Sequence, residues 1–282
     1  MISLLLKELR MHRGGIIGWA VGLGLWGGLV PLLYPSVGTQ FARIDLPDFY
    51  AAFGPVGALG ELSAFLTLEV FNFAIPIGLA IYGLVLGVGV LAGEEDDGTL
   101  ELWMALPTPR WQLVLAKALS IAVSLAIVVA GLCLSTWLGI LAIEEEAIRD
   151  GLDVSVGAED LALVALQSWL LVLALAMIVL FLGAYLPHRK QATLVGTVVI
   201  AVSYLLDSLA EITEKLDPYR WLSLSHYYDV HALMTSGFIW EDAAVLGGIA
   251  AVFLVLALLS FERRNVTVGA WPWQRPRVTE QA

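Results

Sequence analysis

The sequence predicts an all-α, polytopic integral membrane protein with about six transmembrane helices. Hydrophobic residues make up 59% of the 282 residues and charged residues only 15%, against roughly 25% charged in an average soluble domain. The apolar residues gather into six long stretches that contain few charges. Because each stretch is long enough to cross about 30 Å of hydrocarbon as a helix, lipid rather than a protein core accounts for this apolar surface.

The chain divides into an N-terminal helix (1–14), a transmembrane domain (15–261) and a basic cytoplasmic tail (262–282). The third span is longer than one perpendicular crossing requires, so we expect it to tilt or to extend into the cytoplasm near Lys117. The six predicted spans cover residues 15–34, 70–92, 113–142, 161–186, 192–210 and 243–261.

The first 14 residues predict a short amphipathic helix at the membrane interface. Ile2, Leu5 and Leu9 share one helical face, while Lys7 and Arg10 lie mostly opposite. The apolar stretch precedes the charges and no small-residue cleavage site follows, so the segment does not have the pattern of a signal peptide. A frayed terminus is the alternative interpretation.

The placement of lysine and arginine predicts the orientation in the membrane. Eleven of the 15 lie on the side that holds both termini and the loops 93–117 and 187–191. Loops with an excess of these cations stay in the cytoplasm. We therefore expect cytoplasmic N- and C-termini, in a multi-pass protein of a prokaryotic inner (plasma) membrane.

Glycines recur at a spacing of four residues in the first two spans. This spacing allows the backbones of two helices to approach closely. Packing inside one subunit and contact between two subunits both explain it. The rows are Gly14, Gly18 and Gly22, then Gly24 and Gly28, Gly83 and Gly87, and Gly89 and Gly93.

Several classes of site are not indicated. The net charge of −11 argues against a nucleic-acid partner. The single cysteine, Cys133, allows no intramolecular disulfide, and no pattern of catalytic, cofactor-binding or metal-binding residues is present. His226, Asp229 and His231 are close in sequence but lack a further ligand, so an interfacial helix is the preferred interpretation.

Two polar residues near the spans are candidates for a transport pathway. Asn72 and Asp207 belong to segments that are otherwise apolar, and charged or polar groups at such positions are functional candidates. The alternative interpretation is structural. Asn72 can bond a neighbouring helix, and Asp207 can begin an acidic rim at the outer surface with Glu211.

The most informative stretch is the cytoplasmic loop GEEDDGTLELWMALPTPRWQLVLAK, residues 93–117. Leu100, Trp103 and Met104 lie at spacings that form one apolar helical face. Gly98 precedes this short helix and Pro107 stops it. We expect an amphipathic helix parallel to the membrane, whose apolar face is too small for a core of its own. It should dock on another protein; the alternative is a stiff loop that packs only on its own subunit.

This loop resembles the first cytoplasmic loop of type-2 ABC transporter permeases, the membrane subunits of ABC exporters. The six spans, the cytoplasmic termini and the amphipathic N-terminal helix are also similar. The purely acidic run 94–97 departs from the family, which often has basic residues there. The matching positions are Glu94, Gly98, Thr99, Leu100, Glu101, Leu102, Ala105, Leu106, Pro107, Arg110, Trp111, Gln112 and Lys117.

The resemblance implies that this loop contains a coupling helix that docks in a groove of an ATPase subunit. The residues implied for this interface are Glu94, Thr99, Glu101, Leu106, Pro107 and Arg110.

The sequence contains no G-x-x-x-x-G-K-[ST] phosphate loop. ATP and Mg²⁺ are therefore expected on a separate ATPase subunit, and this chain is not expected to be an enzyme. Six spans form half a pore, which implies a second copy or a related permease. The function predicted is ATP-driven export of a drug, lipid or other hydrophobic or amphipathic molecule, with membrane lipids as further partners. An ATP-independent secondary transporter and a membrane assembly factor are the alternatives.

Overall fold

The computed structural model describes residues 1–41, 61–96, 109–152, 154–186, 188–213 and 215–263. Six of its helical segments are long and apolar enough to cross a membrane. No strand occurs within these described ranges. Together these findings confirm the predicted all-α, polytopic class.

The first span is a single helix, α1 (Ile2–Leu29), with no break after residue 14. The predicted interface segment 1–14 is thus helical and continues directly into the span. Pro31 begins the 3₁₀ turn η1 (Pro31–Leu33), and α2 (Tyr34–Phe41) follows. Proline lacks the N–H that would extend the α-helical hydrogen bonding, which explains the change of helix type at this point.

The second span begins earlier than predicted and is irregular. Its first turn, α3 (Leu62–Leu66), is completely buried. Three of the following segments are π-helical, a rare form that is frequent at functional sites. In order the segments are α3 (Leu62–Leu66), η4 (Thr67–Phe71), η5 (Ala74–Leu79), α4 (Ala80–Val88), η6 (Gly89–Gly93) and α5 (Glu94–Asp96).

The third span, α7 (Arg110–Arg149), has 40 residues. At 1.5 Å per residue it is about 60 Å long, roughly twice the hydrocarbon thickness. It is therefore longer than one perpendicular crossing requires, and its tilt or its extension into the cytoplasm near Lys117 remains a prediction. It also continues past residue 142, because the run EEEAIR is favourable for a helix and Glu145 pairs with Arg149 one turn later at 3.9 Å.

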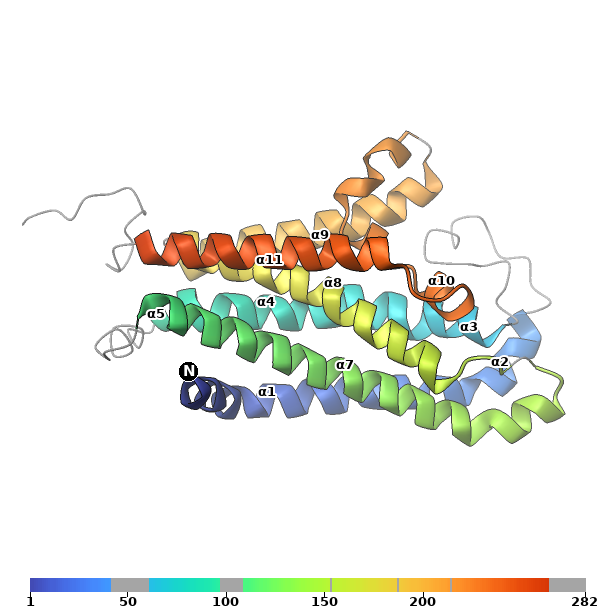
Figure 1. Ribbon diagram of the computed structural model, residues 1–282. Coiled ribbons are helices and arrows are strands. Elements are labelled where there is room, and N and C mark those ends of the chain that lie inside the picture. Colours follow the sequence, from blue (N-terminus) through green and yellow to red (C-terminus); the bar gives the residue numbers. More distant parts are fainter. Residues whose placement is uncertain (42–60, 97–108, 153, 187, 214, 264–282) are drawn as a thin grey trace, which may run out of the picture.

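The remaining spans are α8 (Ala158–Tyr185), α9 (Arg189–Ile212) and α11 (Trp240–Arg263). Between α9 and α11 lie three short helices, η7 (Asp217–Leu222), η8 (Ser225–Tyr227) and α10 (Val230–Thr235). In Figure 1 the end of α9 and η7 form a hairpin that projects from the side of the bundle.

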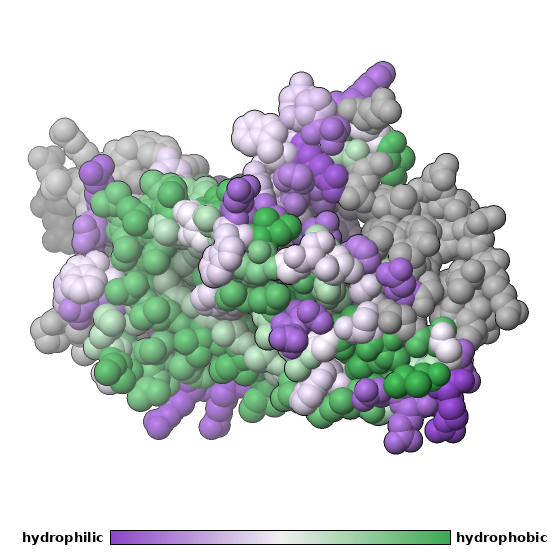
Figure 2. All heavy atoms as spheres, turned by 45° about the vertical axis from the view of Figure 1, so that its right-hand side comes forward, coloured by the Kyte–Doolittle hydropathy of each residue, from purple (hydrophilic) through white to green (hydrophobic). Residues whose placement is uncertain are grey.

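The long helices lie side by side, with α8 packed against α4, α7, α9 and α11 (Figure 1). In the second span, α7 and α8 more than half of the apolar stretch is buried, whereas less than a quarter of it is buried in α1, α9 and α11. Figure 2 shows apolar side chains over much of the bundle surface and polar ones mainly towards its ends and on the projecting hairpin. This distribution suits a lipid environment around the bundle.

Both described chain ends lie at one end of the bundle. The start of α1 and the end of α11 are found there, together with α5 and the beginning of α7 (Figure 1). The two sides of the loop 97–108 therefore start at the end predicted to face the cytoplasm, which we call the inner end. The opposite end, with α2, α3 and α10, is called the outer end.

The glycine rows separate into packed and unpacked positions. A Cβ at Gly87 would lie 2.9 Å from Val179 Cγ1 on α8, and one at Gly28 would lie 3.3 Å from the carbonyl oxygen of Ser135 on α7. These rows pack inside the subunit. A Cβ at Gly14, Gly18 or Gly22 would meet no described atom within 4 Å, so packing within the subunit does not explain that row.

Candidate functional site

The inner end holds the residues that flank the predicted coupling helix. Glu94 begins α5 and Arg110 begins α7, so they stand on the two sides of the loop. Glu94 is buried and Arg110 is half-buried. The other predicted interface residues, Thr99, Glu101, Leu106 and Pro107, lie outside the described residues.

A buried ion cluster joins three segments at this end. The Nζ atom of Lys117 on α7 donates to Oε1 of Glu94 at 2.7 Å and to Oε1 of Glu8 on α1 at 3.0 Å. Lys117 is completely buried and Glu8 is only 2% exposed. In this conformation the Glu94 carboxylate therefore contacts its own chain, and its predicted contact with an ATPase subunit remains a prediction.

The cluster was not predicted, although the sequence contained a signal for it. Lys117 lies within the apolar run LVLAKALSIAV, and a charge at such a position needs a partner. Glu8 is the one acidic residue among the basic residues of the first 14 positions. Nothing in the spacing of residues 8, 94 and 117 indicates that these three side chains meet, because the packing of α1 against α7 brings them together.

The inner end of α9 lies against the same region. The guanidinium carbon of Arg189 would be 3.7 Å from a Cβ at Gly93, so the Arg189 side chain packs over the backbone just before Glu94. Because 3.7 Å is an ordinary van der Waals distance, an alanine at position 93 would also fit against this guanidinium. A cation of α9 thus lies next to the start of the loop.

Asp207, one of the two predicted pathway residues, forms an ion pair at the outer end. Its Oδ1 accepts a hydrogen bond from Arg220 Nε at 2.8 Å, which connects α9 with η7. Ser203, one turn earlier, accepts a bond from the Leu224 N–H at 2.8 Å, and Ser223 Oγ donates to the Ser203 carbonyl at 2.6 Å. These bonds hold η7 and the residues that follow it against α9.

The same outer segment is fixed to α8. Gln167 Nε2 donates to the Tyr227 carbonyl at 2.7 Å, and Ser168 Oγ lies 2.9 Å from Tyr228 Oη. Tyr228 is buried, and burial raises the pKa of its phenol, so the hydroxyl stays protonated and available for this bond. Asp229 then caps α10 by accepting from the Ala232 N–H at 2.9 Å.

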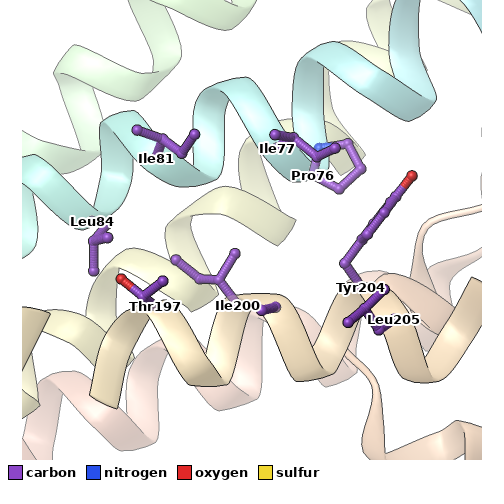
Figure 3. Close-up of a pocket in the computed structure, with 9 residues that line it drawn as sticks. Pro76, Ile77, Ile81, Leu84, Thr197, Ile200, Tyr204 and Leu205 are labelled. Carbon is purple, nitrogen blue, oxygen red and sulfur yellow. The ribbon is translucent and has the colours of Figure 1, made fainter. Parts of the chain in front are cut away.

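An apolar cleft of about 300 Å³ lies between the second span and α9 (Figure 3). It is half-open to the surface of the subunit. In Figure 3 the Tyr204 ring points from α9 towards Pro76, and Ile77, Ile81 and Leu84 come from the opposite wall. The lining is almost entirely apolar and consists of Pro76, Ile77, Ile81, Leu84, Thr197, Ile200, Ala201, Tyr204 and Leu205.

The cleft has a structural boundary at Gly196. A Cβ at this glycine would lie 2.7 Å from Leu84 Cδ1, so α4 and α9 are in close contact there. From Thr197 to Leu205 the cleft follows α9 for about 12 Å. One wall includes residues of the π-helical segment η5, where Pro76 interrupts regular α-helical hydrogen bonding.

Neither predicted pathway residue lines this cleft. Asn72, which is half-buried, lies between the π-helical segments η4 and η5, and Asp207 lies beyond Leu205 and faces Arg220. The residues predicted from sequence are polar, whereas the cleft is formed by apolar side chains that are individually indistinguishable from lipid-facing ones. Within the described part of the chain, no group of three His, Cys, Asp or Glu side chains is placed to hold a metal ion.

Six helices that are long and apolar enough to cross a membrane define a polytopic membrane protein. Comparison with curated proteins finds no match. The model of a family described as ABC-2 family transporter protein matches residues 43–266. Because the match covers most of the chain, the protein belongs to the ABC-2 transporter family, and the resemblance found in its cytoplasmic loop is confirmed.

Proposed function

We propose that this chain is the permease subunit of an ATP-driven exporter and forms half of a translocation pathway. The half-open cleft between the second span and α9 carries this proposal. An apolar hollow at the surface of a helical bundle can take up an apolar molecule that the closely packed interior excludes. A cleft that is open on one side can be completed by a second permease subunit, either identical or related.

The lining of the cleft supports the substrate class. Thr197 and Tyr204 are the residues of the lining that carry a hydroxyl group, and no charged residue takes part. A strongly polar or charged cargo would lose its hydration there without compensating hydrogen bonds. A hydrophobic or amphipathic cargo such as a drug or lipid loses little hydration in the cleft.

The flanks of the cytoplasmic loop support coupling to a separate ATPase subunit. Glu94 and Arg110 both lie at the inner end, so the loop 97–108 begins and ends on one surface of the bundle. The sequence has no phosphate loop. ATP and Mg²⁺ would therefore bind the partner, and this chain would respond to the partner's movement.

The test is to purify the tagged chain from its native membranes in mild detergent. We expect a co-purifying polypeptide with a phosphate loop and vanadate-sensitive ATP hydrolysis. The variants Leu106→Asp and Arg110→Glu should lose this partner, because they place a charge at an apolar contact and reverse a charge at the loop's end. Lys190→Glu, a charge reversal at an exposed residue of the same end, is the control and should retain it.

Two results would contradict the proposal. One is purification of the intact wild-type chain without any ATPase. The other is retention of the ATPase by both loop variants. Uptake of an amphipathic fluorescent dye into inverted vesicles without ATP would instead support a secondary transporter.

A further inference from the structure

The Glu8–Lys117–Glu94 cluster connects two groups of helices at the inner end. The N-terminal helix α1 packs mainly on α7, whereas η6, which precedes the last turn of the second span, packs on α8 and α9 outside its own span. Lys117 and Glu8 belong to the first group and Glu94 follows η6 directly. The ion pair between Lys117 and Glu94 therefore crosses from one group to the other, next to the loop 97–108.

The two carboxylates depend on the same ammonium group. Lys117 Nζ lies 3.0 Å from Glu8 Oε1 and 2.7 Å from Glu94 Oε1. Such short, charge-assisted bonds fix the direction of both side chains. The second oxygen of Glu8 has no hydrogen-bond partner among the residues that the structure describes. Lys117 is thus the described contact that holds the Glu8 carboxylate in its buried position.

The position of the cluster relative to the loop is also specific. Glu94 lies three residues before position 97, on the entering side of the loop. Lys117 lies seven residues after Arg110, about 10 Å along α7 from the leaving side. The cluster thus links Glu94, which precedes the loop, to α7, the helix that follows the loop. It also links both of them to α1.

We propose that Lys117 is a positioning residue that makes the N-terminal helix α1 move together with the cytoplasmic loop during the ATPase cycle. This inference rests on the proposed function, since it needs an ATPase subunit that moves the loop. Displacement of the loop pulls on Glu94, Lys117 transmits the displacement to Glu8, and the inner part of α1 changes its position relative to the membrane surface.

The test uses a reporter on α1 in the complete complex. Cys133, which is buried in α7, is replaced by alanine, and an environment-sensitive fluorophore is attached at Met11→Cys, an exposed position on α1 that lies one turn after Glu8. The complex with its ATPase subunit is placed in lipid nanodiscs. The emission of the label is recorded without nucleotide, with ATP and with ATP plus vanadate.

Glu8→Gln is the central variant, because it leaves Lys117 and Glu94 as a neutral pair and removes only the ion pair with α1. We expect the parental complex to change its emission on addition of ATP, and we expect Glu8→Gln to lose this change while the ATPase still co-purifies. Lys117→Arg, which retains the charge and the donors, should keep the change. Lys190→Met removes an exposed cation at the same end and should also keep it.

The inference is wrong if Glu8→Gln retains the full ATP-dependent change of emission, or if the parental complex hydrolyses ATP without any change at position 11. Both results leave the proposed function intact, because an active ATPase is bound. Failure to recover an ATPase with the parental chain contradicts the proposed function itself. If Glu8→Gln does not fold, Glu8→Met, which removes the carboxylate without leaving a polar group buried, serves in its place with the same expected loss.

Discussion

Arg220 and Asp207 form an ion pair of 2.8 Å that holds the hairpin of α9 and η7 together at the outer end of the molecule. Both side chains are partly exposed, at 28% and 20%. The pair lies one turn beyond Ser203, whose bonds to Leu224 and Ser223 reinforce the same contact. The outer segment is thus connected to α9 by side chains rather than by regular secondary structure.

Removal of this pair should loosen the hairpin without unfolding the bundle. We expect Asp207→Asn and Arg220→Gln each to lower the free energy of unfolding by about 1 kcal/mol, because partial exposure weakens the interaction. Limited proteolysis between residues 213 and 222 should become faster in both variants. The double variant should be little less stable than either single variant. A sum of the two single effects would show that the residues act independently.

Removal of Lys117 should be far more damaging. Lys117→Met leaves two carboxylates buried without their cation, and loss of one partner of a buried ion pair costs about 3–5 kcal/mol. Thermal unfolding in detergent should show a large decrease in stability. The triple variant Glu8→Gln, Glu94→Gln, Lys117→Met should recover most of it, since the three positions of the cluster then carry no charge. Lys190→Met, at an exposed site, should have almost no effect.

Two glycines on α4 provide a matched pair for helix packing. A Cβ at Gly87 would lie 2.9 Å from Val179 Cγ1 and 3.0 Å from the Ala176 carbonyl oxygen, whereas one at Gly83 would lie 3.5 Å from Ala176 Cβ. Gly87→Ala should therefore cost about 1–3 kcal/mol through overpacking, and Gly83→Ala should be close to neutral. Thermal unfolding of both variants measures the difference. Equal stability of the two variants would mean that α4 and α8 move apart to accommodate the added methyl group at no cost.

Filling the cleft should block transport while leaving the complex intact. Ala201→Trp introduces a large ring into the cleft lining. We expect the ATP-dependent transport of an amphipathic dye to fall on the order of ten-fold, which corresponds to about 1.4 kcal/mol of weaker binding. Leu194→Trp, at a 66% exposed position of the same helix outside the cleft, is the control. Equal dye transport in both variants would place the pathway elsewhere.

The orientation can be tested with single cysteines in a Cys133→Ala background. Asp150 lies in the exposed turn after α7, and Lys190 lies in the exposed first turn of α9 at the opposite end. A membrane-impermeant maleimide should label Asp150→Cys on intact cells and Lys190→Cys only after permeabilisation. The reverse pattern would place both termini outside the cytoplasm.

The predictions made from sequence succeeded where a local pattern has one physical explanation. Six apolar stretches have no stable environment other than lipid, so the number of spans and the fold class followed directly. The loop motif identified the family because its residues are contiguous. The ends of the spans were predicted less accurately. α7 continues through residues 144–149, beyond the predicted end at 142, because glutamate is a good helix former and extends the helix past the apolar run that defines the span.

The amino-acid sequence by itself determined that this protein is a six-span helical membrane protein of the ABC-2 family, since hydropathy and a contiguous motif are properties of neighbouring residues. Only the tertiary structure decided which charges meet. Residues 8, 94 and 117 are distant in the chain and become partners because α1 packs on α7 beside the end of the second span. The cleft has the same origin, since its apolar residues acquire a shared wall only when η5 and α4 lie opposite α9.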